Sequence, residues 1–398
     1  MRLLYLTPRL PYPPNRGGEI IIFHFLEQLS SRHDITLVSF YDRPEDLEHR
    51  KHLEPYCSRI EAVPRPAKLA PRALLRSLAG GWSYSIARHT SESFRAAVRR
   101  ATAASRPDLV QLETFLMAPY LAELPGVPSV LHMHDMTWVM WERMARIAPF
   151  YVRPLVAAEA RRIRRDELAL CRTVDMCVPV SEVDLSHLRA AIPGVRAAVV
   201  VPGVDCDALT PGERPASSSN LVFVGSMNYM PNIDAAQFFV KDVLPRISRE
   251  ISDVTFTIVG ARPSPAVRRL GDDPRVRVTG PVDDVRPYYA AAAAAVVPLR
   301  AAGGVRMKIL EGMALGVPIV STTIGAEGLG LEDGCELLIG DTPQQLADAA
   351  IRLVRDSALR ERLSRQARAT ALRRFSWESV GRRLEEIYAS VLAAEVRR

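Results

Sequence analysis

Apolar residues fall into short runs that alternate with longer stretches of helical spacing. In the first half of the chain this pattern predicts strands separated by helices. The predicted strands are Arg2–Thr7, Ile35–Tyr41, Leu109–Glu113, Ser129–His132 and Met176–Pro179, and the predicted helices lie near Glu19–Ser31, Ser91–Ala104 and Pro154–Arg172. Such an alternation is typical of βαβ units on a parallel sheet, so residues 1–201 are predicted to form one doubly wound α/β domain.

The alternation returns after a break. Residues 202–220 are rich in proline, glycine and serine and are predicted to be a linker. Residues 221–375 are predicted to form a second doubly wound domain, with strands at Leu221–Gly225, Val254–Val259, Arg275–Thr279, Ala295–Pro298, Pro318–Thr323 and Glu336–Ile339, and helices near Asn232–Ile247, Val285–Ala292, Val305–Leu315 and from Thr342. A final helix near Trp377–Glu395 follows. Two such domains predict a cleft, because doubly wound sheets bind ligands at the carboxyl ends of their strands.

Composition excludes several classes of protein. The longest apolar run, Tyr288–Leu299, is too short to span a bilayer, and the N-terminal stretch has too few apolar residues before its prolines for a signal peptide, so we expect a cytoplasmic protein. The 5 cysteines match no zinc or redox spacing and are expected to be reduced. The net charge is +7, but without the clustered basic stripe that a nucleic-acid-binding protein needs.

Candidate chemistry gathers in GGVRMKILEGMALGVPIVST, residues 303–322. Gly303 and Gly304 permit close backbone approach, and the N–H groups near Gly304, Val305 and Arg306 form an anion site that suits a phosphate. Lys308 and Glu311 share one face of the following helix. A carboxylate near an anion should bind hydroxyl groups, such as a ribose diol. The alternative is that Lys308 and Glu311 form only a surface ion pair.

Several motifs together resemble glycosyltransferase family 4, and in particular the sugar transferases associated with exopolysaccharide and exosortase loci. The motifs are LVFVGSMNYMPNIDAAQFFVKDVLPRI, FTIVGARP, VRVTGPVDDVRPYYAAA, VVPLRAAGGVRMKILEGMALGVPIVST, TPRLPYPPNRGGEI, VPVSEVDLSHL and FSWESVGRRLEEIYASVL. The resemblance implies the GT-B fold, with two Rossmann-like domains facing a cleft and a C-terminal helix (376–398) that returns to the first domain. It also implies transfer of a sugar, with retention, from a nucleotide-diphospho-sugar co-substrate. We expect no metal and no other cofactor, since no DxD-like pair precedes a glycine turn.

The resemblance also implies which residues bind the donor. They are Gly225, Ser226, Asn228, Val282, Gly303, Gly304, Val305, Arg306, Lys308 and Glu311. Glu311 matches the second of two family glutamates, the one on the ribose, but the first glutamate falls on Gly303. Many members carry an Arg and a Lys for the diphosphate where this chain has Ser226 and Asn232. Arg306 and Lys308 are therefore expected to supply that charge.

In the first domain, Gly17 and Gly18 follow the first strand and precede a helix, so their backbone is expected to approach the donor phosphates. The alternative is an ordinary strand-to-helix turn. LHMHDM ends a later strand, and His134 with Asp135 best matches the family histidine near the transferred sugar. His132 points to the same face as His134, so the choice between the two stays open.

The acceptor is expected to be a sugar, a lipid-linked sugar or a small molecule. Trp138 and Trp141 are candidates to cover it, although aromatic residues at this spacing are more often core. Arg161, Arg162, Arg164 and Arg165 nearly ring a helix and suggest peripheral contact with the inner membrane, but the acids among them favour a solvated face.

Two alternatives keep the same fold. One is a nucleotide-sugar epimerase, which would need a pair of carboxylates poised for proton transfer, and no clear pair is present. The other is a non-catalytic nucleotide-sugar-binding protein, which the glycine at position 303 permits. A nicotinamide oxidoreductase is the least favoured alternative, because no G-x-G-x-x-G opens a helix after the first strand of either domain.

Overall fold

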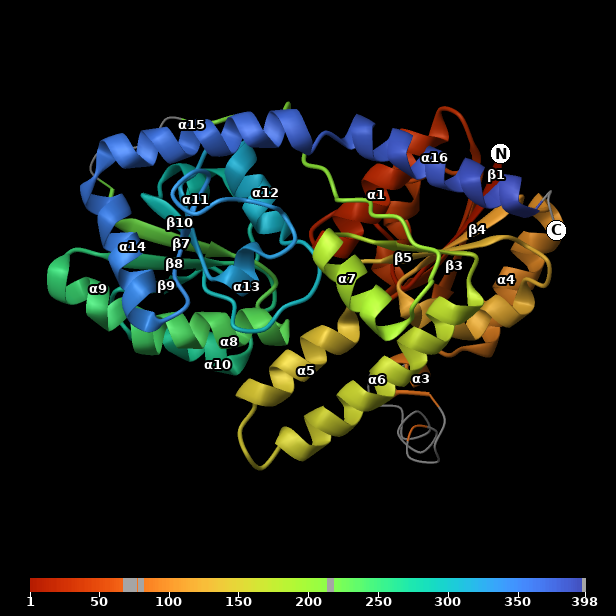
Figure 1. Cartoon of the computed structure of the whole chain (residues 1–398), viewed down its shortest axis with the longest axis horizontal. Coiled ribbons are helices and arrows are strands. Elements are labelled where there is room, and N and C mark those ends of the chain that lie inside the picture. Colours follow the sequence, from red (N-terminus) through yellow and green to blue (C-terminus); the bar gives the residue numbers. More distant parts are fainter. Residues whose placement is uncertain (67–76, 78–81, 213–217, 396–398) are drawn as a thin grey trace. The chain divides into compact units, whose positions relative to one another are not determined.

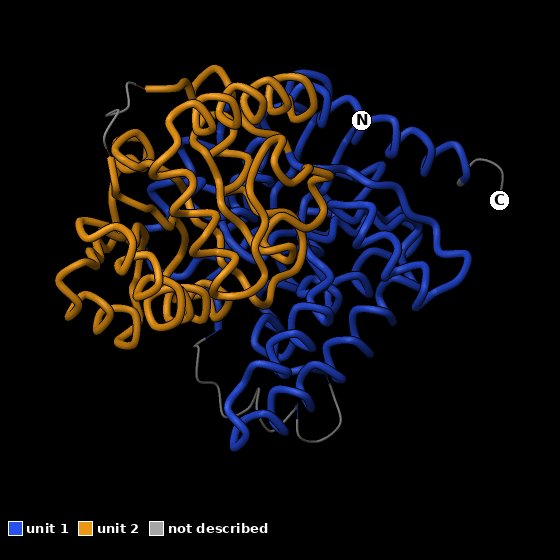
Figure 2. The backbone as a smooth tube through the Cα atoms, turned by 60° about the vertical axis from the view of Figure 1, so that its left-hand side comes forward, with its two compact units in different colours: residues 1–202, 377–398 blue, residues 203–376 orange. Residues whose placement is uncertain are grey.

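Two separate six-stranded sheets organise the chain, as the alternation of strands and helices predicted. The structure, a computed structural model, describes residues 1–66, 77, 82–212 and 218–395. Contacts between Cα atoms divide it into a first unit, Met1–Pro202 with Trp377–Arg398, and a second unit, Gly203–Ser376. Figures 1 and 2 show the elements and the two units.

The sheet of the first unit has the strand order β3-β2-β1-β4-β5-β6, and neighbouring strands are parallel. Its strands are β1 (Arg2–Thr7), β2 (Asp34–Tyr41), β3 (Arg59–Pro64), β4 (Leu109–Glu113), β5 (Ser129–Met133) and β6 (Met176–Pro179). Its helices are α1 (Gly17–Ser30), α3 (Tyr84–Ala87), α4 (Glu92–Ser105), α5 (Thr137–Ile147), α6 (Arg153–Thr173), α7 (Glu182–Ala191) and α16 (Trp377–Glu395), with 3-10 helices over Pro44–His52 and Phe115–Glu123.

The sheet of the second unit repeats this topology, with the order β12-β11-β10-β7-β8-β9. Its strands are β7 (Asn220–Val224), β8 (Thr255–Val259), β9 (Val276–Val278), β10 (Ala294–Val297), β11 (Ile319–Ser321) and β12 (Leu338–Ile339). Its helices are α8 (Met230–Phe238), α9 (Leu244–Glu250), α10 (Pro265–Arg268), α11 (Arg286–Ala290), α12 (Met307–Ala314), α13 (Thr323–Ala326), α14 (Pro343–Arg355) and α15 (Ser357–Arg374). A π-helical turn, Phe239–Val243, and a 3-10 turn, Arg269–Asp272, complete it.

The central strands are buried and mainly apolar because helices cover both faces of each sheet. Every residue of β4, β5 and β10 is buried. Strands buried on both faces need continuous apolar runs rather than alternating ones, which is why these segments stand out in the sequence. The order 3-2-1-4-5-6 in both units is the Rossmann order, which places a topological switch point between the first and fourth strands.

Some predicted boundaries change in the structure. One helix was expected over Asn232–Ile247, but α8 and α9 are separated by the π-helical turn at Phe239–Val243. Pro245 lies at the start of α9 and has no N–H to donate, so the backbone relaxes just before it. The predicted linker, 202–220, holds no helix or strand among its described residues before β7 begins at Asn220. The two units divide between Pro202 and Gly203, and residues 213–217 lie outside the described residues.

The last helix, α16, belongs to the first unit, where it packs against α1. Glu385 on α16 pairs with Arg32 at 2.9 Å and with His33 at 2.8 Å. Leu384, Ile387, Tyr388 and Val391 bury the inner face of this helix. Across the described residues, no helix combines the length and the apolar character that crossing a bilayer requires.

Candidate functional site

In the second unit, the candidate donor residues gather at the switch point of the sheet. β7 and β10 are neighbours, and they are the first and fourth strands of this unit in chain order. Gly225 directly follows β7, and the glycine turn and α12 follow β10. The carboxyl ends of these two strands therefore bring together residues some eighty positions apart, which is where doubly wound sheets bind ligands.

Lys308 connects the two loops. Its Nζ donates to Asn232 Oδ1 at 2.8 Å and lies 4.3 Å from the centre of the Phe223 ring. Asn232 in turn donates through Nδ2 to the carbonyl oxygen of Ser226 at 3.0 Å. The structure places the ammonium group beside Asn232, the position where many family members are expected to carry a lysine. The cation is thus supplied from α12 instead of α8.

Lys308 and Glu311 on α12 are both half-buried, and this burial shifts the pKa of each side chain. Burial lowers the pKa of Lys308 to about 7, with Glu311 opposing the shift and Arg306 adding to it. Burial also raises the pKa of Glu311, and Lys308 offsets part of that rise. Among the described side chains, the Lys308 ammonium donates to Asn232 and lies over the Phe223 ring, so the alternative of a surface ion pair with Glu311 is not what the structure shows. An anion near Lys308 would restore its full charge.

Arg306 was predicted to supply charge to a diphosphate, but its guanidinium group is bonded to backbone carbonyl groups. Only 6% of its surface is exposed, and its guanidinium donates to the carbonyl oxygens of Gly303 (2.5 Å), Gly325 (3.2 Å) and Glu327 (3.3 Å). These bonds hold the glycine turn and the loop after α13 together. The hypothesis that Arg306 binds a diphosphate stays untested, but its donors already stabilise the backbone of the turn.

Glycine is required where backbone and side chains crowd. A Cβ on Gly225 would stand 2.8 Å from Lys308 Nζ, and one on Gly260 would stand 1.7 Å from the carbonyl oxygen of Gly225. Gly304 has a φ of +66°, which a branched side chain rarely adopts. Of the other predicted donor residues, Ser226, Val282, Gly303 and Val305 are half-buried and Asn228 is exposed.

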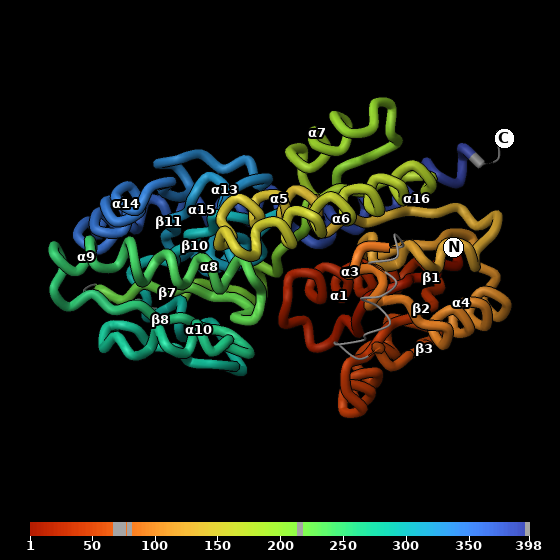
Figure 3. The backbone as a smooth tube through the Cα atoms, turned by 90° about the horizontal axis from the view of Figure 1, so that it is seen from below, coloured from red at the N-terminus to blue at the C-terminus, as the bar shows by residue number. Residues whose placement is uncertain are grey.

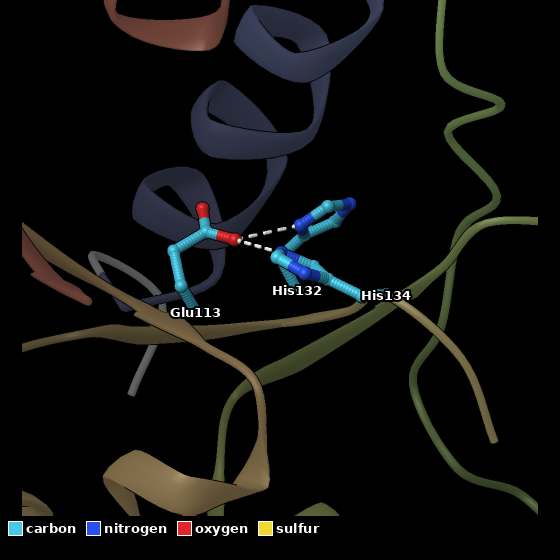
Figure 4. A group of neighbouring side chains, drawn as sticks. All are labelled: Glu113, His132 and His134. Carbon is cyan, nitrogen blue, oxygen red and sulfur yellow. Dashed lines mark hydrogen bonds and ion pairs between the residues drawn. The ribbon is translucent and has the colours of Figure 1, made fainter. Parts of the chain in front are cut away.

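In the first unit, three side chains meet at the carboxyl ends of β4 and β5. Glu113 is the last residue of β4, and its Oε2 accepts from His132 Nδ1 at 2.8 Å and from His134 Nε2 at 2.7 Å. Figure 4 shows both imidazoles directed at the same carboxylate oxygen. The register of the sheet causes this, because Glu113 pairs with His132 across β4 and β5.

A chain of buried hydrogen bonds supports Glu113 from behind. Its Oε1 accepts from Gln111 Nε2 at 2.5 Å, and Gln111 Oε1 accepts from the Tyr388 hydroxyl of α16. The hydroxyl groups of Tyr388 and Tyr5 are 2.6 Å apart. Since Tyr388 uses its proton on Gln111, Tyr5 is the donor to Tyr388. These residues are fully buried, so β1, β4 and α16 together fix the direction of the carboxylate.

This network distinguishes the two histidines. Burial lowers the pKa of His132, and its ring lies against Phe25 with Nε2 unbonded. His134 keeps 16% of its side chain exposed, and its Nδ1 is the ring atom closest to Gly18, where an added Cβ would stand 2.8 Å away. With Nε2 donating to Glu113, the neutral form of His134 presents Nδ1 as an acceptor at the start of α1. His134 is therefore the reachable histidine, and Gly18 makes room for it.

The carboxylate stays ionised in spite of its burial. Burial by itself would raise the pKa of Glu113, but hydrogen bonds and charge from His132 and His134 bring it below its usual value. Glu113, His132 and His134 are also the one group among the described residues whose atoms could ligate a metal ion, all within 4.8 Å of one another. The hydrogen bonds through these same atoms satisfy Glu113 without an ion.

The other predicted residues near this strand end have structural partners. Asp135 Oδ1 accepts from the Thr137 hydroxyl at 2.5 Å, at the start of α5. Trp138 is buried in the core and Trp141 packs partly against it, which agrees with the core interpretation of both. Gly17 and Gly18 form the first turn of α1, which has no side-chain cap.

Neither Glu113 nor Gln111 was among the predicted residues, although the sequence holds a signal for them. The strand LVQLE is apolar apart from two residues spaced by two, which share a face. Polar side chains buried on a central strand need partners. The partner from α16 is more than 270 residues away in the chain, so no local pattern could have indicated it.

We expect Tyr388→Phe to lower the thermal unfolding midpoint of the first unit. The substitution leaves Gln111 Oε1 and the Tyr5 hydroxyl without their partner in a dry core, which costs about 1–3 kcal/mol, or roughly 2–4 °C per kcal/mol. Tyr151→Phe is the matched control, because that hydroxyl belongs to a side chain that is 69% exposed. Equal thermal unfolding midpoints for the two variants would contradict a stabilising role for the buried chain of hydrogen bonds.

Comparison with known sequences gives matches over both units. A family model described as "Glycosyltransferase Family 4" matches residues 15–208, and one described as "Glycosyl transferases group 1" matches residues 218–356. A D-inositol 3-phosphate glycosyltransferase of Nocardioides sp. is 28% identical over 305 residues, which cover 68% of this chain and 64% of that enzyme. A Klebsiella pneumoniae protein of the cps region, itself uncharacterized, is 21% identical over 85% of this chain and 87% of its own length.

Solved structures show the same fold. Sucrose-phosphate synthase from Thermosynechococcus elongatus aligns over 99% of this chain and 100% of its own with a TM-score of 0.76 at 18% identity. HepE of Anabaena, in complex with UDP-glucose, aligns over 98% of this chain and 100% of its own with a TM-score of 0.65, also at 18% identity. The two Rossmann-like units are thus those of the GT-B fold.

Proposed function

Because this chain belongs to glycosyltransferase family 4, we propose that it transfers a sugar, with retention and without a metal, from a nucleotide-diphospho-sugar to an acceptor in polysaccharide or glycolipid synthesis. The observation that supports this most is the position of Lys308. A cation held beside Asn232 at the switch point of the second sheet suits a diphosphate, the most highly charged part of such a donor.

The donor would lie along α12. Lys308 would contact the diphosphate, and the uncapped start of the helix, which follows Gly304, would add backbone N–H groups. Glu311 lies one helical turn further along and would accept the two ribose hydroxyls. Arg306 would support this site by keeping the glycine turn in shape through its three carbonyl partners.

The reaction would proceed on one face of the sugar. The bond between the anomeric carbon and the diphosphate oxygen breaks, the acceptor oxygen bonds to the same face, and the acceptor's proton passes to the departing diphosphate. Lys308 stabilises the negative charge that grows on that leaving group, the type of effect that is usually largest in such sites. The role of the first unit would be to place the acceptor and the transferred sugar near His134.

Glu113 would act through His134 as a positioning residue. It holds the imidazole with Nε2 as donor, which leaves Nδ1 free to accept from a sugar hydroxyl. We place the protein in the cytoplasm, in peripheral contact with the inner membrane, so that a lipid-linked acceptor can reach this histidine.

A panel of nucleotide sugars tests the function. UDP-sugars come first, since HepE was solved with UDP-glucose. At about one hundred times its dissociation constant, a true donor should stabilise the protein by roughly 2.7 kcal/mol, and slow hydrolysis should release nucleoside diphosphate. Retention is checked by the anomeric configuration of the released or transferred sugar. Binding without any turnover would favour a non-catalytic binding protein, and failure of the whole panel would remove the donor-site argument.

A further inference from the structure

The most exposed large apolar side chains of the described residues lie together at one place. Phe150, Tyr151 and Leu155 are 84%, 69% and 72% exposed, whereas the next most exposed, Leu372, is 52% exposed. Phe150 and Tyr151 lie in the turn between α5 and α6, and Leu155 lies in the first turn of α6. Residues 149–155 are called the hairpin tip below. Isolated exposed apolar residues are ordinary, but three neighbours at this level of exposure indicate a surface that another apolar phase covers.

The hairpin tip is held rigidly at the end of a long projection. α5 and α6 pack against each other along their length, and Figures 1 and 3 show them side by side with the turn at one end. The N–H groups of Val152 and Arg153 both donate to the carbonyl oxygen of Pro149 at 3.0 Å. The Arg153 guanidinium donates to the carbonyl oxygens of Arg146 (3.3 Å) and Ala148 (3.4 Å). The apolar side chains are therefore presented by an ordered turn.

The charge around the hairpin tip has one sign. Residues 143–158 contain Arg143, Arg146 and Arg153 and no acidic residue. Arginines beside exposed aromatic and aliphatic side chains match the boundary of an anionic bilayer, where apolar groups enter the acyl region and cations stay with the head groups. Tyr151 adds an amphipathic ring of the kind enriched at that boundary.

Three of the four arginines that first suggested membrane contact have partners within the protein. Arg162 pairs with Glu159 at 3.9 Å, Arg165 pairs with Asp166 at 2.7 Å, and Arg164 lies over the Trp138 ring at 4.7 Å. Asp166 and Glu167 are buried and accept backbone N–H groups of Ser83 and of Thr137 and Trp138. Most of α6 thus makes contacts within the first unit. The apolar and cationic surface lies at the N-terminal end of α6, at the hairpin tip.

A convex tip of seven residues suits a lipid surface better than a protein partner. A stable protein interface buries about 800 Å² on each side, more than three side chains at the end of a hairpin can supply. A bilayer needs no matching shape and takes up side chains individually. We infer that the hairpin tip inserts Phe150, Tyr151 and Leu155 into the surface of an anionic membrane, with Arg146 and Arg153 at the lipid phosphates.

Sedimentation with vesicles tests this inference. The full chain is mixed with vesicles of phosphatidylglycerol and phosphatidylcholine, or of phosphatidylcholine alone. We expect the parent to bind the anionic vesicles and Phe150→Ser/Leu155→Ser to bind at least tenfold more weakly. Arg146→Gln should reduce binding to the anionic vesicles only. Leu372→Ser, at the next most exposed large apolar side chain, on α15, is the control and should bind like the parent.

Other outcomes overturn the inference. The parent failing to bind anionic vesicles, or the tip variant binding as the parent does, would show that the tip does not contact lipid. Light scattering without vesicles tests whether the hairpin tip instead binds a second copy of the chain. If the parent is a dimer and the tip variant is a monomer, the tip is a self-association surface. The tip variant should keep the parent's thermal midpoint and its response to nucleotide sugars, so failure of membrane binding and failure of the proposed donor site give different results.

Discussion

Lys308→Met should weaken nucleoside diphosphate binding by roughly ten- to a hundredfold, the equivalent of a charged hydrogen bond of about 1.5–3 kcal/mol. It should leave the affinity for the bare nucleoside almost unchanged, because the ammonium beside Asn232 is proposed to contact only the phosphate end of the ligand. Lys241→Met, on an exposed lysine of the same unit, is the control and should bind like the parent. Calorimetric titration of nucleoside, monophosphate and diphosphate measures the series.

The lowered pKa of Lys308 leads us to expect that the affinity for nucleoside diphosphate depends on pH. In the free protein burial lowers the pKa of Lys308 to about 7, and a bound diphosphate would raise it. Above pH 7 the ligand must therefore bring a proton with it, so affinity should fall as pH rises, by up to tenfold per pH unit. Below pH 7 the lysine is already charged and this dependence should fade. Lys308→Met should abolish it, and an unchanged pH profile in that variant would assign the charge elsewhere.

Glu113→Gln should lower sugar transfer by roughly a hundredfold or more, within the range that a positioned proton donor or acceptor contributes. The carboxylate accepts two imidazole N–H groups on one oxygen and the Gln111 amide on the other. A glutamine presents an NH₂ group at one of these ends, so either the histidines or Gln111 face a donor. His134 then loses its orientation, while diphosphate binding in the second unit should stay as in the parent.

Turnover and nucleotide affinity are measured on the same preparations, with Glu182→Gln on an exposed face of α7 as the control. His134→Gln should reproduce the loss of turnover with little loss of thermal stability, since this ring is at the edge of the network. A Glu113→Gln enzyme with the parent's turnover would show that the cluster serves only the fold of the first unit.

The sequence predicted the two domains because their central strands are buried on both faces. β1, β4 and β6 begin and end at the residues predicted for them. β3 was not predicted, since it is an edge strand whose residues are mostly half-buried or exposed and whose pattern is correspondingly mixed. α5 was not predicted either. Its N-terminus is capped by Glu167 from α6, a contact that no local signal reveals.

For the candidate sites, the sequence determined which loops carry the chemistry, because glycine turns and polar residues at strand ends are local features. It placed Lys308 and Glu311 on α12, His132 at the end of β5 and His134 just after that strand. Only the tertiary structure decided what these side chains contact. It bonds Lys308 to Asn232 and Arg306 to backbone carbonyls, and it makes His134 rather than His132 the reachable ring. Hydrogen bonds depend on distances between residues far apart in the chain, and only the strand order and the packing of α16 set those distances.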